Sequence, residues 1–178
     1  MYKRNIVIVT IIFFIHTFTF KAWAEESIVQ APSAILIDSS TGRILYEKNI
    51  HQKMYPASIT KIMTAIIALE NGNLNDIVTA SEKAVRSVEP GSSHIGILPG
   101  EQLTLEQLLY GSLIASANDG ANIIAEHIAG SIEEFVNLTN KRAKELGAIN
   151  THFVNTHGFH DDNHYTTAYD MALIAKHA

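Results

Sequence analysis

The sequence predicts an α+β fold in which one β-hairpin precedes a cluster of helices. The runs 33–38 and 43–47 are short and β-rich, whereas the later periodic segments have helical spacing. Because strands and helices occupy separate stretches of the chain, α+β is favoured over an alternating α/β fold. A lone hairpin is marginally stable in water, so we expect further antiparallel strands, which this sequence does not clearly provide.

The hairpin and the helix after it have recognisable ends. Ser39-Ser-Thr-Gly42 separates the two β-rich runs, and its glycine can adopt a positive φ without steric cost. After Pro56, apolar residues recur at helical spacing over 59–70, and the pattern stops at Asn71-Gly72. This stretch is apolar on more than one side, so we expect its helix to run through the core.

Four more helices are predicted from capping residues and apolar spacing. Two of them begin with a possible capping box, in which a Ser or Thr and a Glu or Gln three residues later satisfy each other's backbone N–H groups. Gly147 can close the third of the four. The helices are expected at 104–113, 119–129, 131–146 and from 167 onward, with capping boxes at Thr104–Gln107 and Ser131–Glu134.

Composition bounds the class of protein. The 178 residues are 47% hydrophobic and 17% charged, which fits one globular domain and excludes a disordered chain or a collagen-like fibre. The absence of cysteine excludes disulfides and cysteine-ligated metal sites. The formal net charge of −5 disfavours nucleic acid or anionic lipid as the main partner, so no nucleic-acid partner is expected.

The first 24 residues have the pattern of a secretory signal peptide. Lys3-Arg4 precedes an apolar stretch over 6–20, and Ala22-Trp23-Ala24 supplies small residues for cleavage. This stretch is shorter than the roughly 20 residues that cross a bilayer, so an uncleaved anchor is the less favoured alternative. We expect 1–24 to be removed and 25–178 to be exported to the extracellular or periplasmic face of the cytoplasmic membrane.

A serine and a lysine stand three residues apart at the start of the predicted core helix. A helix brings the Ser58 and Lys61 side chains to one face, about 5–6 Å apart at Cβ. Serine is a poor nucleophile until a base removes its proton, and lysine can be that base if its pKa falls from about 10.4 towards 7 or 8. Burial among Ile62, Met63 and Ile66 favours such a fall. Taken alone, the pair also fits an N-cap serine and a solvated lysine.

Ser116-Ala117-Asn118 forms a second polar constellation between two predicted helices. The Ser116 hydroxyl can relay a proton to a leaving amine, and the Asn118 amide can hold either a substrate carbonyl or the lysine. The same residues, with Asp119, also fit an ordinary turn that caps the next helix.

Together the two motifs resemble those of the serine penicillin-recognising enzymes. The flanking sequence is similar to the low-molecular-mass D-alanyl-D-alanine carboxypeptidases over nearly all of residues 31–178. Four segments carry this similarity, namely Pro56-Ala-Ser-Ile-Thr-Lys-Ile-Met-Thr64, Ser116-Ala-Asn-Asp-Gly-Ala-Asn122, Thr151-His-Phe-Val-Asn-Thr-His-Gly158 and His164-Tyr-Thr-Thr-Ala-Tyr-Asp-Met171.

The resemblance implies a β-lactamase/DD-peptidase-like fold and a reaction. Ser58 would be the acylated nucleophile, Lys61 its general base, Ser116 a further catalytic residue and Asn118 a substrate-binding residue. The implied reaction removes the terminal D-alanine of peptidoglycan stem peptides through an acyl-enzyme, without cofactor or metal. β-Lactam antibiotics would be covalent inhibitors at the same serine.

The family's third motif, Lys-Thr-Gly on a downstream strand, does not occur in this sequence. That strand lines the cleft and supplies an oxyanion-hole N–H, and loss of one such donor costs about 10²–10³ in rate. We therefore expect 25–178 to be the N-terminal portion of the catalytic domain, with an incomplete sheet. We also expect that such a protein can associate with the membrane through a missing C-terminal segment.

Two other functions fit the same motifs. The chain could be a catalytically inactive fragment that binds penicillin or peptidoglycan, because it lacks Lys-Thr-Gly. A β-lactamase is less favoured, since class A enzymes have Asp where this chain has Ala117 and a glutamate about 36 residues further on, in the region of His152.

Histidines gather between positions 152 and 164 and invite a metal-site interpretation. Gly158 and Asp161-Asp-Asn163 predict a loop, in which solvated or hydrogen-bonded histidines need no metal, and we expect none. His157 is expected to border the cleft through its matching segment. The 89–94 segment resembles the family's variable loop above the site and fits a surface turn equally well.

Overall fold

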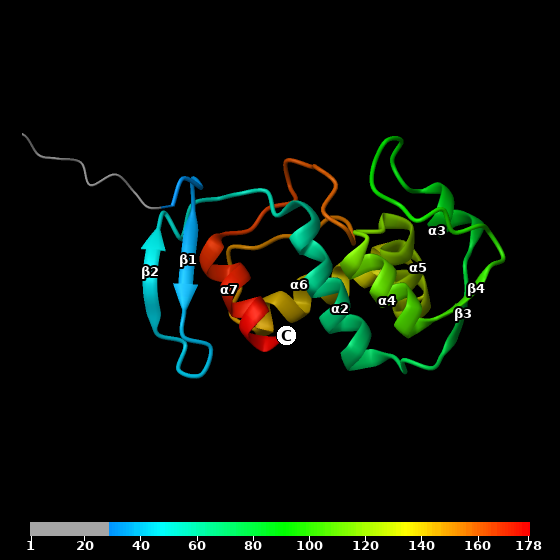
Figure 1. Ribbon diagram of the computed structural model, residues 1–178, viewed down its shortest axis with the longest axis horizontal. Helices are drawn as coiled ribbons and strands as arrows, with labels where there is room; N and C mark the ends of the chain where they lie inside the picture. The colour runs from blue at the N-terminus through cyan, green and yellow to red at the C-terminus, as the bar shows by residue number, and fades with distance from the viewer. Residues whose placement is uncertain (1–28) are drawn as a thin grey trace, which may run out of the picture. The chain divides into compact units, whose positions relative to one another are not determined.

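The computed structural model describes residues 29–178, so the expected signal peptide at 1–24 lies outside the described residues. Residues 31–178 form one unit held together by mutual contacts. Its elements, labelled in Figure 1, are β1 (Ala34–Ile37), β2 (Ile44–Lys48), the 3₁₀ turn η1 (Ala57–Ile59), α2 (Thr60–Asn71), β3 (Ile77–Thr79), α3 (Glu82–Arg86), β4 (Gln102–Thr104), α4 (Leu105–Ile114), α5 (Asn118–Ala129), α6 (Ile132–Glu145) and α7 (Ala168–His177).

The predicted hairpin is confirmed. β1 and β2 pair antiparallel, with an irregularity between Leu36 and Ile37, and Gly42 in the turn has φ +75°. Hydrogen bonds from Ser40 and Thr41 lower the pKa of the Asp38 carboxyl to about 2. The turn is therefore held by an ionised Asp38 that accepts local donors, as Asp commonly does in turns.

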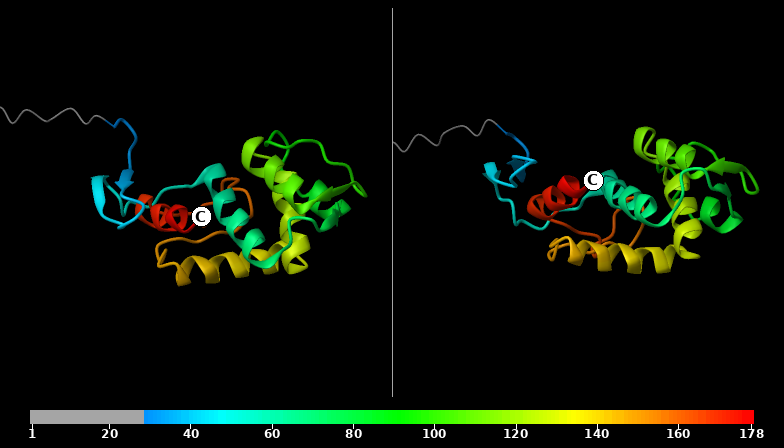
Figure 2. Two further views of the ribbon diagram at one scale, coloured as in Figure 1. Left: turned by 60° about the horizontal axis from the view of Figure 1, so that its bottom comes forward. Right: turned by 90° about the horizontal axis from the view of Figure 1, so that it is seen from below.

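Helix α2 is the central helix of the unit, as its pattern of apolar residues on more than one side predicted. It contacts α4, α5, α6 and α7, and its residues belong to two separate core clusters. Ala65 and Ala68 pack with α4, α5, β3 and β4, whereas Met63, Ile66 and Ile67 pack with α6 and α7. In both views of Figure 2, α6 lies below α2 and α7. Helix α2 therefore links the two halves of the hydrophobic core.

The ends of the later helices mostly agree with the sequence. The Thr104–Gln107 capping box is present in full, and Thr167 caps α7. At α6, Ser131 accepts the N–H of Glu134 at 3.0 Å, but no return bond from Glu134 is among the described contacts. The second capping box is therefore only half formed.

Three short elements were not predicted from the sequence. β3 and β4 pair antiparallel as a separate two-stranded sheet, and α3 lies between them in the chain. Strands of three residues show too little alternation to be recognised. Within residues 29–178 they do not extend the hairpin, so the expected completion of that sheet is absent from the described part.

An apolar groove of about 520 Å³ lies beside the hairpin, between β1, α2 and α7. Leu36 and Ile59, which line it, are 56% and 47% exposed. Figure 1 shows β1 next to α7, and the two elements are in contact.

Within residues 29–178, no helix combines the length and apolar character needed to cross a bilayer.

Candidate active site

Ser58 and Lys61 lie in consecutive turns where η1 passes into α2. Ala57, just before the serine, has φ +49°, a left-handed conformation that is costly for a residue other than glycine. Ser58 is exposed to solvent, whereas Lys61 is only 3% exposed. The strained turn thus presents a hydroxyl at the surface above a buried amine.

Ser116 connects these two side chains. Its hydroxyl donates to Ser58 Oγ at 2.9 Å and accepts from Lys61 Nζ at 3.2 Å. The sequence predicted only that Ser58 and Lys61 share a helix face; in the structure the Ser116 hydroxyl bridges the two side chains. Ser116 reaches this position in the turn between α4 and α5, where it has φ +56°. Left-handed residues of this kind cluster at functional sites, where strain fixes a side chain.

Burial tunes the lysine as its apolar surroundings predicted. Desolvation lowers the pKa of Lys61 from 10.5 to about 8. Besides Ser116, the ammonium donates to the backbone carbonyl oxygen of His157 at 3.1 Å. An amine with this pKa exists partly in its neutral form near pH 7, so it can accept a proton.

The three side chains can move a proton from one end of the series to the other. Hydroxyl groups rotate and can both donate and accept. When Lys61 is neutral, the two hydroxyls can turn so that Ser58 donates to Ser116 and Ser116 donates to Lys61 Nζ. The arrangement therefore can deprotonate Ser58 as it attacks an electrophile, with the buried amine as the final acceptor.

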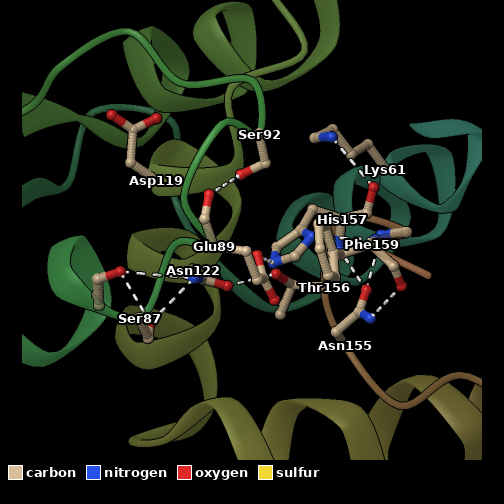
Figure 3. Close-up of polar contacts among 12 residues, drawn as sticks. Lys61, Ser87, Glu89, Ser92, Asp119, Asn122, Asn155, Thr156, His157 and Phe159 are labelled. Carbon is tan, nitrogen blue, oxygen red and sulfur yellow. Dashed lines mark hydrogen bonds and ion pairs between the residues drawn. The ribbon is translucent and has the colours of Figure 1, made fainter. Parts of the chain in front are cut away.

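The segment 155–158 backs this site. The carbonyl of Thr156 accepts from Thr64 of α2 at 2.5 Å, and its hydroxyl donates to Asn122 of α5 at 2.6 Å. Gly158 has φ +90°, and a Cβ atom there would lie 1.7 Å from the Ala57 carbonyl oxygen. Figure 3 shows Thr156 and His157 beside Asn122 and Lys61. The carbonyl that holds the lysine is thus fixed from two helices.

Asn118 lies at the start of α5, close in sequence to Ser116, and is 5% exposed. Its backbone N–H donates to the Ser93 carbonyl at 2.9 Å. Among the described contacts its side chain makes no hydrogen bond, so the expected alternative in which it holds Lys61 is not observed. The amide remains available to a bound molecule.

Asp119, which the sequence suggested only as a helix cap, also holds a loop beside the site. Its carboxylate accepts the backbone N–H groups of its neighbour Gly120 and of three loop residues, at 2.9–3.3 Å. The loop residues are Ile95, Gly96 and Ile97. The carboxylate thereby anchors the 89–98 loop on the helix that follows Ser116, and only the tertiary structure reveals those partners.

Three of the four histidines in the 152–164 segment are hydrogen-bonded within the protein, and the fourth, His160, is 63% exposed. His164 contacts Thr60 Oγ1 through Nε2 at 2.9 Å and accepts the Val154 N–H at Nδ1, while His152 Nδ1 contacts the Asn163 carbonyl. No three His, Asp or Glu side chains of residues 29–178 come together as a metal site. His157 reaches the site through its carbonyl, which agrees with its expected place at the border.

Comparison with known proteins identifies what the chain is similar to. Residues 20–178 match the D-alanyl-D-alanine carboxypeptidase family. The D-alanyl-D-alanine carboxypeptidase DacF of Bacillus subtilis is 47% identical over 152 residues, which cover 83% of this chain and 38% of DacF. For DacC of Escherichia coli the identity is 38% over 176 residues, covering 92% of this chain and 44% of DacC.

Solved structures give the same result. The D-alanyl-D-alanine carboxypeptidase DacD of Francisella tularensis superposes with a TM-score of 0.78 at 38% identity, covering 84% of this chain and 37% of that one. Penicillin binding protein 5 of Haemophilus influenzae gives 0.78 at 35% identity, with coverages of 84% and 45%. The chain therefore shares the fold of these proteins over less than half of their length.

Proposed function

The chain belongs to the D-alanyl-D-alanine carboxypeptidase family, and we propose that the protein removes the terminal D-alanine of peptidoglycan stem peptides. Ser58 is the nucleophile, Lys61 the general base and Ser116 the proton relay. Asn118 binds the substrate's peptide group. The hydrogen-bonded series from exposed Ser58 through Ser116 to buried Lys61 carries this proposal.

The reaction proceeds in two halves. Ser58 Oγ attacks the carbonyl carbon of the terminal peptide bond while its proton passes through Ser116 to Lys61. The tetrahedral intermediate collapses, the C–N bond breaks, and the proton returns along the same path to the leaving D-alanine amine. Water then hydrolyses the acyl group from Ser58. A β-lactam acylates Ser58 in the same way, but its amine stays tethered within the opened drug.

The proposal includes a place in the cell. Residues 1–24 act as a signal peptide, and 25–178 contribute the N-terminal portion of a catalytic domain that works in the cell wall, outside the cytoplasmic membrane. The basic-apolar-small pattern of the first residues supports export. Such an enzyme acts in peptidoglycan biosynthesis and cell shape, and a further segment can associate it with the membrane.

The proposal is tested with a fluorescent penicillin. We expect the protein to form a covalent adduct that survives denaturing electrophoresis, and Ser58→Ala to remove it. Ser40→Ala, in the hairpin turn, is the matched control and should keep the label. A folded protein that forms no adduct would support the inactive binding fragment instead. Rapid loss of the adduct with release of hydrolysed penicillin would point to a β-lactamase.

A further inference from the structure

The loop between α3 and β4 places the Glu89 carboxylate near His157, the residue whose carbonyl accepts a hydrogen bond from Lys61. Its tight turn is closed by the Glu89 carbonyl, which accepts the Ser92 N–H at 3.1 Å and the Ser92 hydroxyl at 2.7 Å. Pro90 and Gly91, which has φ +78°, occupy the two central positions. This is the sequence of a type II turn, which gives the loop a defined shape at Glu89.

The Glu89 side chain faces the ring of His157. Figure 3 shows the Glu89 and His157 side chains next to each other. Glu89 Oε2 lies 3.7 Å from His157 Nε2, and no group among the described residues is within hydrogen-bonding distance of that buried oxygen. His157 Nδ1 lies 3.3 Å from the Phe159 N–H and accepts from it. A neutral ring must then carry its proton on Nε2, pointing at the carboxylate. Glu89 Oε2 therefore faces an N–H group in a buried place, where polar atoms are usually paired with a donor.

His157 connects Glu89 to the proposed base. The backbone carbonyl of the same residue accepts from Lys61 Nζ at 3.1 Å. Burial, with the nearby charges of Lys61 and His164, lowers the pKa of His157 to about 4, so the ring is neutral near pH 7. Among the described residues, the titratable groups that act on this ring are the Glu89 carboxylate in contact with it and the more distant charges of Lys61 and His164.

The same loop also contacts the residues on either side of Ser116. Ser93 donates through its hydroxyl to the Ala115 carbonyl at 3.1 Å, and its own carbonyl accepts the Asn118 N–H. The loop thus contacts both the residues around Ser116 and the residue that holds Lys61. Such a brace can set the distance between the two partners of a proton transfer.

We propose that Glu89 is a positioning residue, which fixes His157 and, through the His157 carbonyl, holds Lys61 against Ser116. This inference rests on the proposed function, because the effect is exerted on its general base. Gln still presents a side-chain oxygen to the His157 Nε2–H group, whereas Ala does not. Charge at position 89 is therefore less important than an acceptor at that place.

The test compares Glu89→Gln and Glu89→Ala, with Glu82→Gln as the control that removes an exposed carboxylate of α3. The rate of acylation by penicillin is measured against pH. We expect Glu89→Ala to lower the acylation rate at its high-pH plateau about tenfold. The midpoint of the pH profile should also move to higher pH, because a less firmly held His157 admits water to Lys61. Glu89→Gln should keep both within about twofold of the wild type. If Glu89→Ala does not fold, Glu89→Leu replaces it.

A second readout separates this inference from the proposed function. Titration of the Lys61 amine by nuclear magnetic resonance, in protein labelled at lysine, needs no acylation. Absence of acylation in the wild type would reject the proposed function, whereas an unchanged Lys61 titration in Glu89→Ala would reject the role of Glu89. Equal losses in Glu89→Gln and Glu89→Ala would also overturn it, because the acceptor would then be irrelevant.

Discussion

At the scale of single residues, the site depends on one buried amine and two backbone positions of high energy. Lys61 is buried, and Ala57 and Ser116 adopt left-handed conformations that residues other than glycine seldom take. Each such residue costs about 1–3 kcal/mol and persists because the surrounding structure determines it. The local conformation is therefore stabilised by the fold rather than by these residues themselves.

The pH dependence of acylation should report the Lys61 amine. Only neutral Lys61 can accept the Ser58 proton, and its pKa is about 8. We expect the acylation rate to rise about tenfold per pH unit at low pH and to level off above that value. Lys61→Arg, whose guanidinium stays protonated, should abolish acylation. A rate that is flat from pH 6 to 9 would mean that another group is the base.

Gly158 should tolerate no side chain. An alanine Cβ there would lie 1.7 Å from the Ala57 carbonyl oxygen and 2.8 Å from Thr60 Oγ1, so the turn that holds Ser58 would have to move. Gly130 is a matched control, because its φ is +80° but a Cβ atom would meet nothing within 4 Å. We expect Gly130→Ala to cost about 1–2 kcal/mol in urea unfolding. Gly158→Ala should cost more than that and should also suppress penicillin labelling, and equal costs would contradict the proposed contact.

At the scale of elements, helix ends and short loops assemble the site. The 3₁₀ turn η1 supplies Ser58, the first turn of α2 supplies Lys61, and the turn between α4 and α5 supplies Ser116. The loop before β4 and the segment 155–158 brace these turns through backbone groups. Tertiary hydrogen bonds thus bring together residues that lie 58 positions apart.

Asp119 should be the main anchor of the 89–98 loop. In Asp119→Asn one oxygen is replaced by an NH₂ group that faces backbone N–H donors, so at least one charged hydrogen bond is lost. We expect a loss of about 3 kcal/mol in urea unfolding. Asp162→Asn is the control, because its side chain is 85% exposed and its effect should stay within about 0.5 kcal/mol. Similar stabilities of the two variants would show that the loop is held by other contacts.

The sequence predicted the elements that carry strong local signals. The hairpin turn, the α2 apolar pattern and the Thr104 capping box each express a local physical rule, and each is confirmed. β3 and β4 were missed because three residues carry almost no periodicity. The place of Ser116 between Ser58 and Lys61 could not be predicted, since it depends on how one turn packs against another helix. The partners of Asp119 and Glu89 likewise exist only in the folded chain.

At the scale of the whole molecule, α2 joins two hydrophobic clusters, and the η1 turn that leads into it carries the proposed nucleophile. Both clusters therefore support the helix on which the site is built. Buried polar residues share this core, among them His157 and His164, which are 3% and 2% exposed. Their neutral state couples the stability of the unit to pH.

The unit should lose stability in mild acid. Burial is the largest cause that lowers the pKa of both His157 and His164 to about 4, from 6.5. The unfolded chain then binds more protons between these values, so the contribution is fully present above pH 6.5 and is lost as the pH falls towards 4. Each histidine accounts for about 3 kcal/mol of the stability that is lost over this pH range. The free energy of unfolding in urea is measured from pH 7.5 to 4.5. It should fall less steeply with decreasing pH in His164→Gln than in the wild type, and an equally steep fall would contradict the role of His164.

We propose that Ser58, and not the neighbouring Ser116, is the residue acylated by penicillin. The two hydroxyl oxygens lie 2.9 Å apart, so loss of labelling in a variant does not by itself distinguish them. Peptide mapping by mass spectrometry after reaction with penicillin does, because the two serines fall in different peptides. We predict the mass of the opened β-lactam on the peptide that contains Ser58. The same mass on the peptide of Ser116, with the Ser58 peptide unmodified, would contradict the account.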